Sequence, residues 1–529
     1  MKHMKNIKII SFNSLRVVAL ASLALVASCT SDYESINTNK NNIATIGPAE
    51  IPFLFSKAES IAPGSQWNYQ VAQNLFADQY AQYFACEATY FGSDRLVINQ
   101  NWVGGAFNPM YTDAMPQLLT IFENTDPGSA EYALANIWWV YTFHRVTDYW
   151  GPIPYFHAGE DLASVPYDAQ DKIYDDFFAR LKTSTDVLAG KTGETPYGSY
   201  DIIYNGDVNK WIKFANTLRL RLAVRISNVN PSKAKAEAEA AVAGGVFTKS
   251  PDDDALVKRS LKGDDGNGLA IMQWNEFRMS ASMESVLKGY DDPRMQEYFL
   301  PSKRNGTYDG LRNGLTTAQQ TDLSGLSDAD YNSQQGPRWS PASLGGIDTY
   351  LETPQNVMCT AEAYFLRAEG ALKGWSMGGT AKDFYEAGIR NSWLQWGITE
   401  DPTSYINDGT SKPIAPGDLL NSPPMTDIPV LFSATPAVQE EQIATQKWLA
   451  LYPDGMEAWA DYRRSHKLKL YPVANSDNPL ITNTATQYLR RIPFLLSEQQ
   501  NNAEAVEAAK SLLGGEDNTQ TPLWWDTNP

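Results

Sequence analysis

Apolar residues recur on a helical period through most of the chain after about residue 70, and this pattern predicts a mainly α-helical fold. Helices are expected over 70–86, 129–147 and 171–188. Pro231 begins a short helix that ends at Gly244-Gly245. The clearest case is 207–227, whose apolar stripe consists of Trp211, Phe214, Ala215, Leu218, Leu222 and Ile226.

Two later helix pairs have the pattern of stacked helical hairpins. Helices at 355–374 and 380–396 fit a tetratricopeptide-like hairpin, although Glu369 stands where a small residue is usual and a generic hairpin is the alternative. A second pair, 440–452 and 456–464, is broken at Pro453-Asp454-Gly455, and such stacks form extended surfaces rather than deep clefts. The inward positions of the first pair would be Phe365, Ala368, Leu372, Ala381, Tyr385 and Gly388.

Between these helical parts, 251–354 is rich in Gly, Asp, Asn, Ser and Pro, with few long apolar periods. It is expected to form irregular loops with short helices and strands, inserted in a helical scaffold at about 70–250 and 355–529. Loops held on a rigid frame are where ligand contacts usually lie, so this insertion is expected to form the ligand side.

The first residues predict export and a lipid anchor. Basic residues precede the apolar stretch 17–26, which is too short to span a bilayer, and 26–29 (VASC) fits a bacterial lipobox. The predicted parts are a signal peptide over 1–28, a lipidated tether over 29–47 with Cys29 as its acylated residue, and one fold over 48–529. An ordinary secretory signal is the alternative.

Charge and cysteine usage narrow the function further. The formal charge of −18 becomes −22 without the four basic residues of the signal, which argues against nucleic acid as a partner. Cys86 and Cys359, in apolar surroundings, are expected to be buried thiols rather than a disulfide.

The sequence contains no motif for a cofactor, a zinc ion or a familiar nucleophile. His144, His157 and His466 lack zinc spacing, and there is no Gly-x-Ser-x-Gly elbow or phosphate-binding loop. The acidic loops 252–254 and 264–268 offer oxygen ligands for calcium but lack its spaced motif, so solvated loops are favoured. We therefore expect no metal, no cofactor and no enzyme, although carboxylate pairs of a glycosidase depend on three-dimensional distances.

A succession of short motifs resembles the SusD/RagB family of Bacteroidetes outer-membrane lipoproteins, in its SusD-like 2 branch. The motifs follow the family's order from about residue 70 to 500, behind a lipobox. They are DYWGPIPY (148–155), YD (167–168) with IY (173–174), DIIYNGD (201–207), KWIKFANTLRLR (210–221), DPRM (292–295), AEAYFLRAE (361–369), QKWLALY (446–452), EAW (457–459) and RRIPF (490–494).

The resemblance implies a SusD-like α-helical body with tetratricopeptide-like hairpins and a loop-rich side with few short strands. It also implies a non-enzymatic lid that captures nutrient at the cell surface and passes it to a SusC-like TonB-dependent transporter. The motif residues Arg219, Arg221 and Arg294 are expected to pair with buried or half-buried acids rather than to contact ligand.

Candidate ligand residues follow from chemistry and position, because the family's binding residues vary. A sugar site needs flat rings for stacking and polar groups that bond hydroxyls, and the 15 Trp and 27 Tyr supply rings. For any single ring, packing in the core or a loop is the competing interpretation. The candidates are Tyr90, Phe91, Asp94, Arg95, Asn99, Asn101 and Trp102 before the helix at Tyr111, with Trp274, Trp339 and Tyr350 in the loop region.

The sequence therefore predicts a surface-exposed, lipid-anchored outer-membrane protein that binds oligosaccharide for a partner transporter. The alternatives that remain open are a surface glycoside hydrolase, a peptide-binding lid of the same transporter type, and a scaffold with no small ligand.

Overall fold

The computed structural model describes residues 46–260, 266–321, 330–339 and 349–527. Two compact units divide at Glu50, and every helix and strand below belongs to the unit that begins at Ile51. The predicted lipidation site Cys29, the signal and most of the tether lie outside the described residues.

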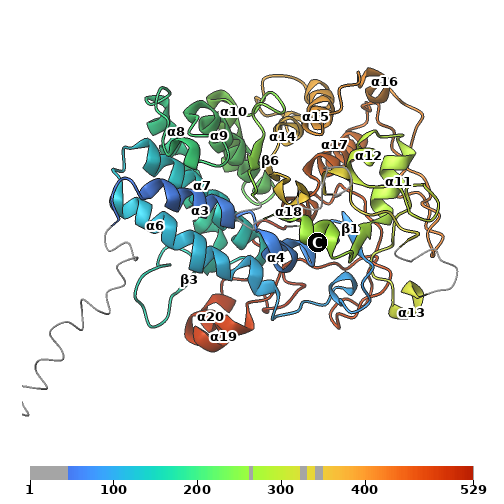
Figure 1. Cartoon of the computed structure of the whole chain (residues 1–529), viewed down its shortest axis with the longest axis horizontal. Coiled ribbons are helices and arrows are strands. Elements are labelled where there is room, and N and C mark those ends of the chain that lie inside the picture. Colours follow the sequence, from blue (N-terminus) through green and yellow to red (C-terminus); the bar gives the residue numbers. More distant parts are fainter. Residues whose placement is uncertain (1–45, 261–265, 322–329, 340–348, 528–529) are drawn as a thin grey trace, which may run out of the picture. The chain divides into compact units, whose positions relative to one another are not determined.

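The first half of this unit is a group of antiparallel helices, drawn from blue to green in Figure 1. α7 packs against α8, α8 against α9 and α9 against α10, while α3 and α6 lie beside each other and α7. Two predicted helix starts are confirmed by caps: Ser129 accepts from the Tyr132 amide, and Asp207 from the Asn209 and Lys210 amides. The bounds are α3 Ile51–Ile61, α6 Met115–Asn124, α7 Ala130–Trp150, α8 Gln170–Ala189, α9 Val208–Arg225 and α10 Pro231–Gly244.

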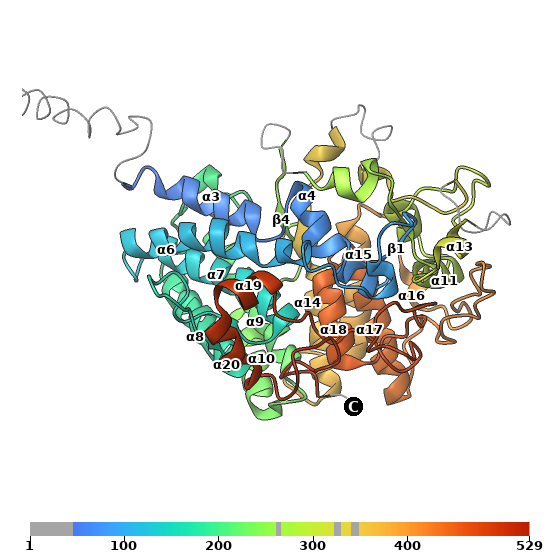
Figure 2. The same cartoon turned by 90° about the horizontal axis from the view of Figure 1, so that it is seen from below.

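The second helical group continues the same stacking, so the predicted hairpins are confirmed. α14 packs against α15 and also against α9, and α17 packs against both α14 and α18 (Figure 2). Phe365 of α14 lies so close to Gly388 of α15 that a Cβ there would come within 2.6 Å of its ring. The bounds are α14 Thr360–Leu372, α15 Ala381–Gln395, α17 Pro436–Leu451 and α18 Gly455–Ser465.

Two predicted helices are wrong in part. Residues 70–86 form a π-helical turn η1, a short helix α5 and a strand β1, and Gln82 with its left-handed φ of 52° interrupts the helical run. Every residue from 71 to 86 is buried, so its apolar positions reflect burial on all sides rather than one helix face. At 355–358 a strand replaces the predicted helix start, because this segment pairs with β4.

The described residues of 251–354 form short helices and strands joined by loops, and the short strands of the described chain form three pairs. Antiparallel pairs are β1 with β5, β2 with β3 and β4 with β6. The strands are β1 Phe84–Cys86, β2 Ile153–Pro154, β3 Tyr167–Asp168, β4 Ala255–Val257, β5 Phe277–Met279 and β6 Gln355–Met358. The shorter helical elements are α4 Gln66–Tyr69, η1 Gln70–Asn74, α5 Ala77–Tyr80, η2 Ser93–Arg95, η3 Val103–Ala106, η4 Met110–Ala114, η5 Gly198–Tyr200, η6 Leu269–Gln273, α11 Ala281–Gly289, α12 Arg294–Tyr298, α13 Thr317–Gln320, η7 Pro337–Trp339, η8 Thr349–Glu352, α16 Thr403–Ile406, α19 Leu496–Asn501 and α20 Ala503–Lys510.

Buried ion pairs join the two helical groups. Arg221 of α9 contacts Glu362 of α14 at 2.6 Å, and both side chains are 1% exposed. Arg225 contacts Glu457 of α18 at 2.6 Å and Asp148 of α7 at 3.4 Å. These contacts confirm a structural role for Arg221. Arg219 and Arg294 also pair as predicted, with Glu237 and Asp292.

The two cysteines of the described residues, Cys86 and Cys359, are buried free thiols, as expected. Within the described residues, no helix is long and apolar enough to cross a membrane.

Candidate functional site

The β1–β5 ribbon brings two candidate segments together. Because the strands are antiparallel, with Cys86 opposite Phe277, the chain after β1 and the chain before β5 meet at one end of the ribbon. The Glu87 amide donates to the Glu276 carbonyl at 2.9 Å, which extends the pairing by one residue. Tyr90 and Phe91 follow on one side and Trp274 precedes on the other.

Phe91 is the support of an aromatic cluster rather than an exposed ring. Its side chain is buried, at 6% exposed, and it stacks on Phe277 of β5 with 6.2 Å between ring centroids. Tyr90 lies over it at 4.5 Å, and Trp102 meets it edge-on at 5.4 Å. Phe91 therefore fixes the positions of two rings that do reach solvent.

Tyr90 is the most exposed ring of the cluster, at 69%. Its hydroxyl donates to Glu276, and Gln70 of η1 donates to the other carboxylate oxygen of Glu276 at 2.5 Å. Partial burial and the bond to Glu276 raise the pKa of Tyr90, so its hydroxyl stays protonated at neutral pH. Glu276 and Gln70 were not among the sequence candidates, because the strand pairing brings Glu276 beside Tyr90 and a tertiary contact brings Gln70 to Glu276.

The loop that carries Trp102 is held against η1. The Asn99 side-chain oxygen accepts from the Asn101 amide at 3.0 Å, and the Trp102 amide donates to the Asn99 carbonyl at 3.1 Å. A Cβ at Gly105 would lie 2.4 Å from the Val71 side chain, so only glycine permits this approach. Trp102 is half-buried, Asn101 is exposed, and Asn99 serves the turn.

Asp94 and Arg95, predicted as ligand groups, are engaged within the fold. Asp94 is 3% exposed and accepts from the Asn313 side chain at 2.8 Å and the Gly314 amide at 2.7 Å. Burial, partly offset by these bonds, raises the pKa of Asp94 to about 6. Arg95 pairs with Asp477 at 2.6 Å. Both side chains hold the loop in place.

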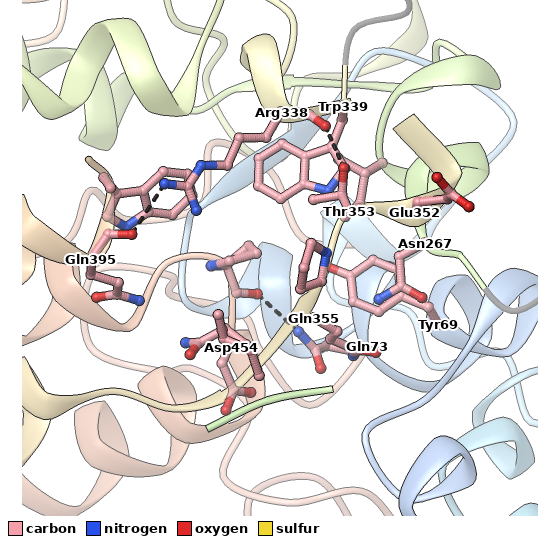
Figure 3. Close-up of a pocket in the computed structure, with 16 residues that line it drawn as sticks. Tyr69, Gln73, Asn267, Arg338, Trp339, Glu352, Thr353, Gln355, Gln395 and Asp454 are labelled. Atoms are coloured by element: carbon pink, nitrogen blue, oxygen red, sulfur yellow. Dashed lines mark hydrogen bonds between the residues drawn. The ribbon is translucent and has the colours of Figure 1, made fainter. Parts of the chain in front are cut away.

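The three candidates from the loop region, Trp274, Trp339 and Tyr350, lie in different surroundings. Trp274 lies at the end of η6, 38% exposed, two residues before Glu276. Trp339 of η7 is 5% exposed and lines a cavity of about 330 Å³ instead (Figure 3). The backbone of Tyr350 belongs to η8, and its side chain lies outside the described part of the chain.

The acidic loop 252–254 has structural partners. Asp252 and Asp253 pair with Lys249 at 2.6 Å and Lys213 at 2.8 Å, while Asp254 accepts from the Thr360 amide at 2.7 Å. Asp264 and Asp265 lie outside the described residues. Over the residues that are described, no three metal-ligating side chains come together.

A relatively exposed set of side chains therefore surrounds the end of the β1–β5 ribbon, with Tyr90, Trp102 and Trp274 as rings and Asn101, Gln70 and Glu276 as polar groups.

Comparison with known proteins identifies the family. The SusD-like model, described as Susd and RagB outer membrane lipoprotein, matches residues 34–526. This chain belongs to the SusD-like family.

Solved SusD homologues share the fold over almost their whole length. A chitin-binding SusD homolog from Flavobacterium johnsoniae is 36% identical, with a TM-score of 0.81 over 90% of this chain and 98% of that one. A homolog from Bacteroides ovatus is 30% identical, with a TM-score of 0.80 over 91% and 100%. One from Bacteroides uniformis is 33% identical, with a TM-score of 0.78 over 91% and 99%. Among curated proteins, no relative matches the sequence.

The SusD-like assignment confirms the predicted family and the predicted helical fold with its hairpins. The family is one of outer-membrane lipoproteins, which agrees with the lipobox at 26–29.

Proposed function

We propose that this SusD-like protein binds oligosaccharide at the aromatic platform formed by Tyr90, Trp102 and Trp274, without chemical conversion. The observation that carries the proposal is the exposure of Tyr90 and Trp274 at one ribbon end, over a buried Phe91. Exposed rings supply faces for pyranose C–H groups, and Glu276, Gln70 and Asn101 supply hydrogen-bond partners for hydroxyls. Because Phe91 already holds Tyr90 and Trp102 in place, these side chains lose little conformational entropy when a ligand binds.

The descriptions of two related structures support a glycan as the ligand. The Flavobacterium johnsoniae homolog is described as chitin-binding, and so is a second structure that is 27% identical with a TM-score of 0.72. We therefore place chito-oligosaccharides first in a ligand panel, followed by oligomers of other neutral sugars and by peptides. Peptide binding without glycan binding would favour a peptide-binding lid instead.

Calorimetry with single variants tests the platform. Tyr90→Ala and Trp274→Ala should each weaken glycan binding about tenfold or more, which corresponds to about 1.4 kcal/mol. Trp102→Ala should also weaken binding, with a small loss of melting temperature because this ring packs on Phe91. Tyr200→Ala is the matched control, since Tyr200 is 42% exposed but belongs to η5, remote in sequence from the ribbon. Equal affinities for all four variants and wild type would refute the platform.

The absence of turnover is tested separately. Purified protein incubated with a glycan that it binds should leave the chain length unchanged in chromatography, and this result should hold with and without added calcium. Repeated cleavage of the same glycan would instead support the alternative of a surface glycoside hydrolase. We propose no cofactor and no metal for the binding step.

We further propose that the protein stands on the cell surface and delivers its ligand to a SusC-like TonB-dependent transporter. The family membership supports this arrangement. Affinity purification of the tagged lipoprotein from detergent-solubilised outer membranes should recover a TonB-dependent barrel in near-equal amount. Protease added to intact cells should digest the protein; full protection would contradict surface exposure.

A further inference from the structure

A second concave site is lined by two elements, η1 and η6, that also build the platform. The cavity of about 330 Å³ is at the lower end of the range of small-molecule pockets, roughly 300–1,000 Å³. η1 contributes Gln73 to it and Gln70 to the bond with Glu276, and η6 contributes Ile271 to it just before Trp274. The contact between η1 and η6 therefore belongs to both sites.

Apolar rings form much of the wall. Tyr69, Trp339 and Trp396 line the cavity and are 1%, 5% and 4% exposed, and the two indoles lie 6.1 Å apart. Figure 3 shows Tyr69 and Asn267 on one side of the space, Arg338 and Trp339 above it, and Gln395 on the opposite side. The two indoles pack against each other, and together with Tyr69 they give the cavity an aromatic wall.

The polar groups at the base of the cavity are satisfied within the protein. Gln73 donates to the Pro453 carbonyl at 2.9 Å and accepts from Arg145 at 3.0 Å. Asp454 pairs with the same arginine at 3.1 Å, and the Tyr69 hydroxyl donates to Asp78 at 2.7 Å. These groups are already paired, so they give no reason to expect a ligand.

Other polar atoms of the wall are buried and have no partner anywhere in the described part of the chain. The set is the side-chain oxygens of Asn267, Asn356 and Gln395 and the indole nitrogen of Trp396. Buried polar groups are hydrogen-bonded in the great majority of native proteins, and an unmade bond costs about 1–3 kcal/mol. Asn267 is 6% exposed, so solvent does not readily supply the missing bond.

The charge of the cavity is modest. The guanidinium of Arg338 lies 4.0 Å from the centre of the Trp396 ring and donates to the backbone carbonyl of Gln395 at 3.1 Å. Among the described residues, no carboxylate lies within salt-bridge distance of Arg338, and Glu352 at the rim is exposed. Three unpartnered acceptors outnumber the indole donor, so an occupant needs hydroxyl or amide donors, which an anion alone does not provide.

We infer that this cavity is a second binding site, which takes one uncharged ring bearing hydroxyl or amide groups, of monosaccharide to disaccharide size. The ring would lie among Tyr69, Trp339 and Trp396 and hydrogen-bond Asn267, Asn356 and the Trp396 indole. The inference goes beyond the proposed function, because the cavity and the platform present different side chains and either can bind without the other.

Indole resonances report the site directly. In protein labelled with ¹⁵N-tryptophan, the Trp396 indole signal, assigned by its loss in Trp396→Phe, should shift on titration with N-acetylglucosamine, glucose or their dimers. Glucuronate is the charged comparison and should shift it less. A shift with glucuronate alone, or no shift with any of these probes at tens of millimolar, would overturn the inference.

Asn267→Leu separates binding from structure. Because the Asn267 oxygen has no partner in the described fold, a leucine of similar size should leave the melting temperature unchanged or raised, while probe affinity falls about tenfold. Asn356→Leu provides a second test if the first variant folds poorly. Unchanged affinity in a folded variant would overturn the site.

The double variant Tyr90→Ala and Trp274→Ala distinguishes this site from the platform. It should lose oligosaccharide binding and keep the Trp396 shift with the small probes. Loss of both in a folded double variant would show one continuous site and overturn a separate one. Platform variants that bind normally would refute the proposed function and leave the result for the cavity standing.

Discussion

His144 shows how burial controls protonation at a single residue of the helical body. It lies on α7, 2% exposed, with Nδ1 3.1 Å from the Val140 carbonyl and Nε2 3.4 Å from Arg221. Nδ1 therefore donates and Nε2 accepts, which requires the neutral ring. Burial, with Arg221, Arg145 and Arg225 nearby, lowers the pKa of His144 well below its usual 6.5.

This lowered pKa predicts an acid-sensitive term in stability. Below pH 6.5 the unfolded chain takes up a proton at His144 that the folded chain does not, so wild type loses up to about 1.4 kcal/mol per pH unit. His144→Gln lacks this term. The stability difference between wild type and variant, measured by urea unfolding, should therefore shrink by about 2 kcal/mol from pH 7 to pH 5.

The exposed His157 is the matched control, and His157→Gln should follow the wild-type pH dependence more closely than His144→Gln. An unchanged difference between wild type and His144→Gln at the two pH values would contradict a neutral, buried His144.

At this scale, sequence predicted the kind of side chain better than its exposure. Tyr90, Phe91 and Trp102 lie in contact in the fold, but nothing in the sequence shows that Phe91 is buried while Tyr90 is exposed. Asp94 has the chemistry of a sugar ligand, yet it bonds Asn313 and Gly314, which are more than two hundred residues away in sequence. Such contacts depend on tertiary structure and have no local signal.

Among the elements, the helical hairpins were predictable because apolar residues recur on a helical period and segments with Gly or Pro, such as Pro453-Asp454-Gly455, mark the breaks between helices. Glu369 stands where this type of hairpin usually has a small residue, and only its contacts in the fold explain why an acidic side chain lies there. It contacts Arg464 at 2.6 Å and Lys447 at 3.1 Å, and these cations, against the effect of burial, lower the pKa of Glu369 to about 2. The strand at 355–358 was missed because its partner β4 lies about one hundred residues earlier.

The α14–α15 hairpin depends on close packing at Gly388. A Cβ there would come within 2.6 Å of the Phe365 ring, so Gly388→Val should lower the free energy of unfolding by about 1–3 kcal/mol. Valine and glycine differ by only about half a kcal/mol in helix propensity, so the clash dominates the effect. Thermal and urea unfolding measure it.

Gly190→Val is the control for this change. Gly190 ends α8 with a φ of −86°, and the nearest atom to its added Cβ is 3.8 Å away. Its stability should stay within about 0.5 kcal/mol of wild type. Equal losses for the two valine variants would show that the hairpin tolerates a side chain at Gly388.

For the whole molecule, buried charge links the first helical group to the second. Arg221→Met should cost about 3–5 kcal/mol, because it leaves Glu362 buried without its partner at 2.6 Å. Arg390 forms a more exposed pair with Asp401 at 3.7 Å, so Arg390→Met should cost less than about 1 kcal/mol. Similar losses for both variants in urea unfolding would contradict this role of burial.

The predicted attachment to the membrane rests on one cysteine. A diacylglyceryl group on Cys29 would supply the two acyl chains that stable anchoring takes. Cys29→Ala should abolish labelling by a palmitate analogue and move the protein from the detergent phase to the aqueous phase of Triton X-114. Cys86→Ala should keep both properties, since Cys86 is a buried thiol of the fold. Detergent partitioning of Cys29→Ala would require another anchor and would exclude lipidation at Cys29 as the basis of membrane attachment.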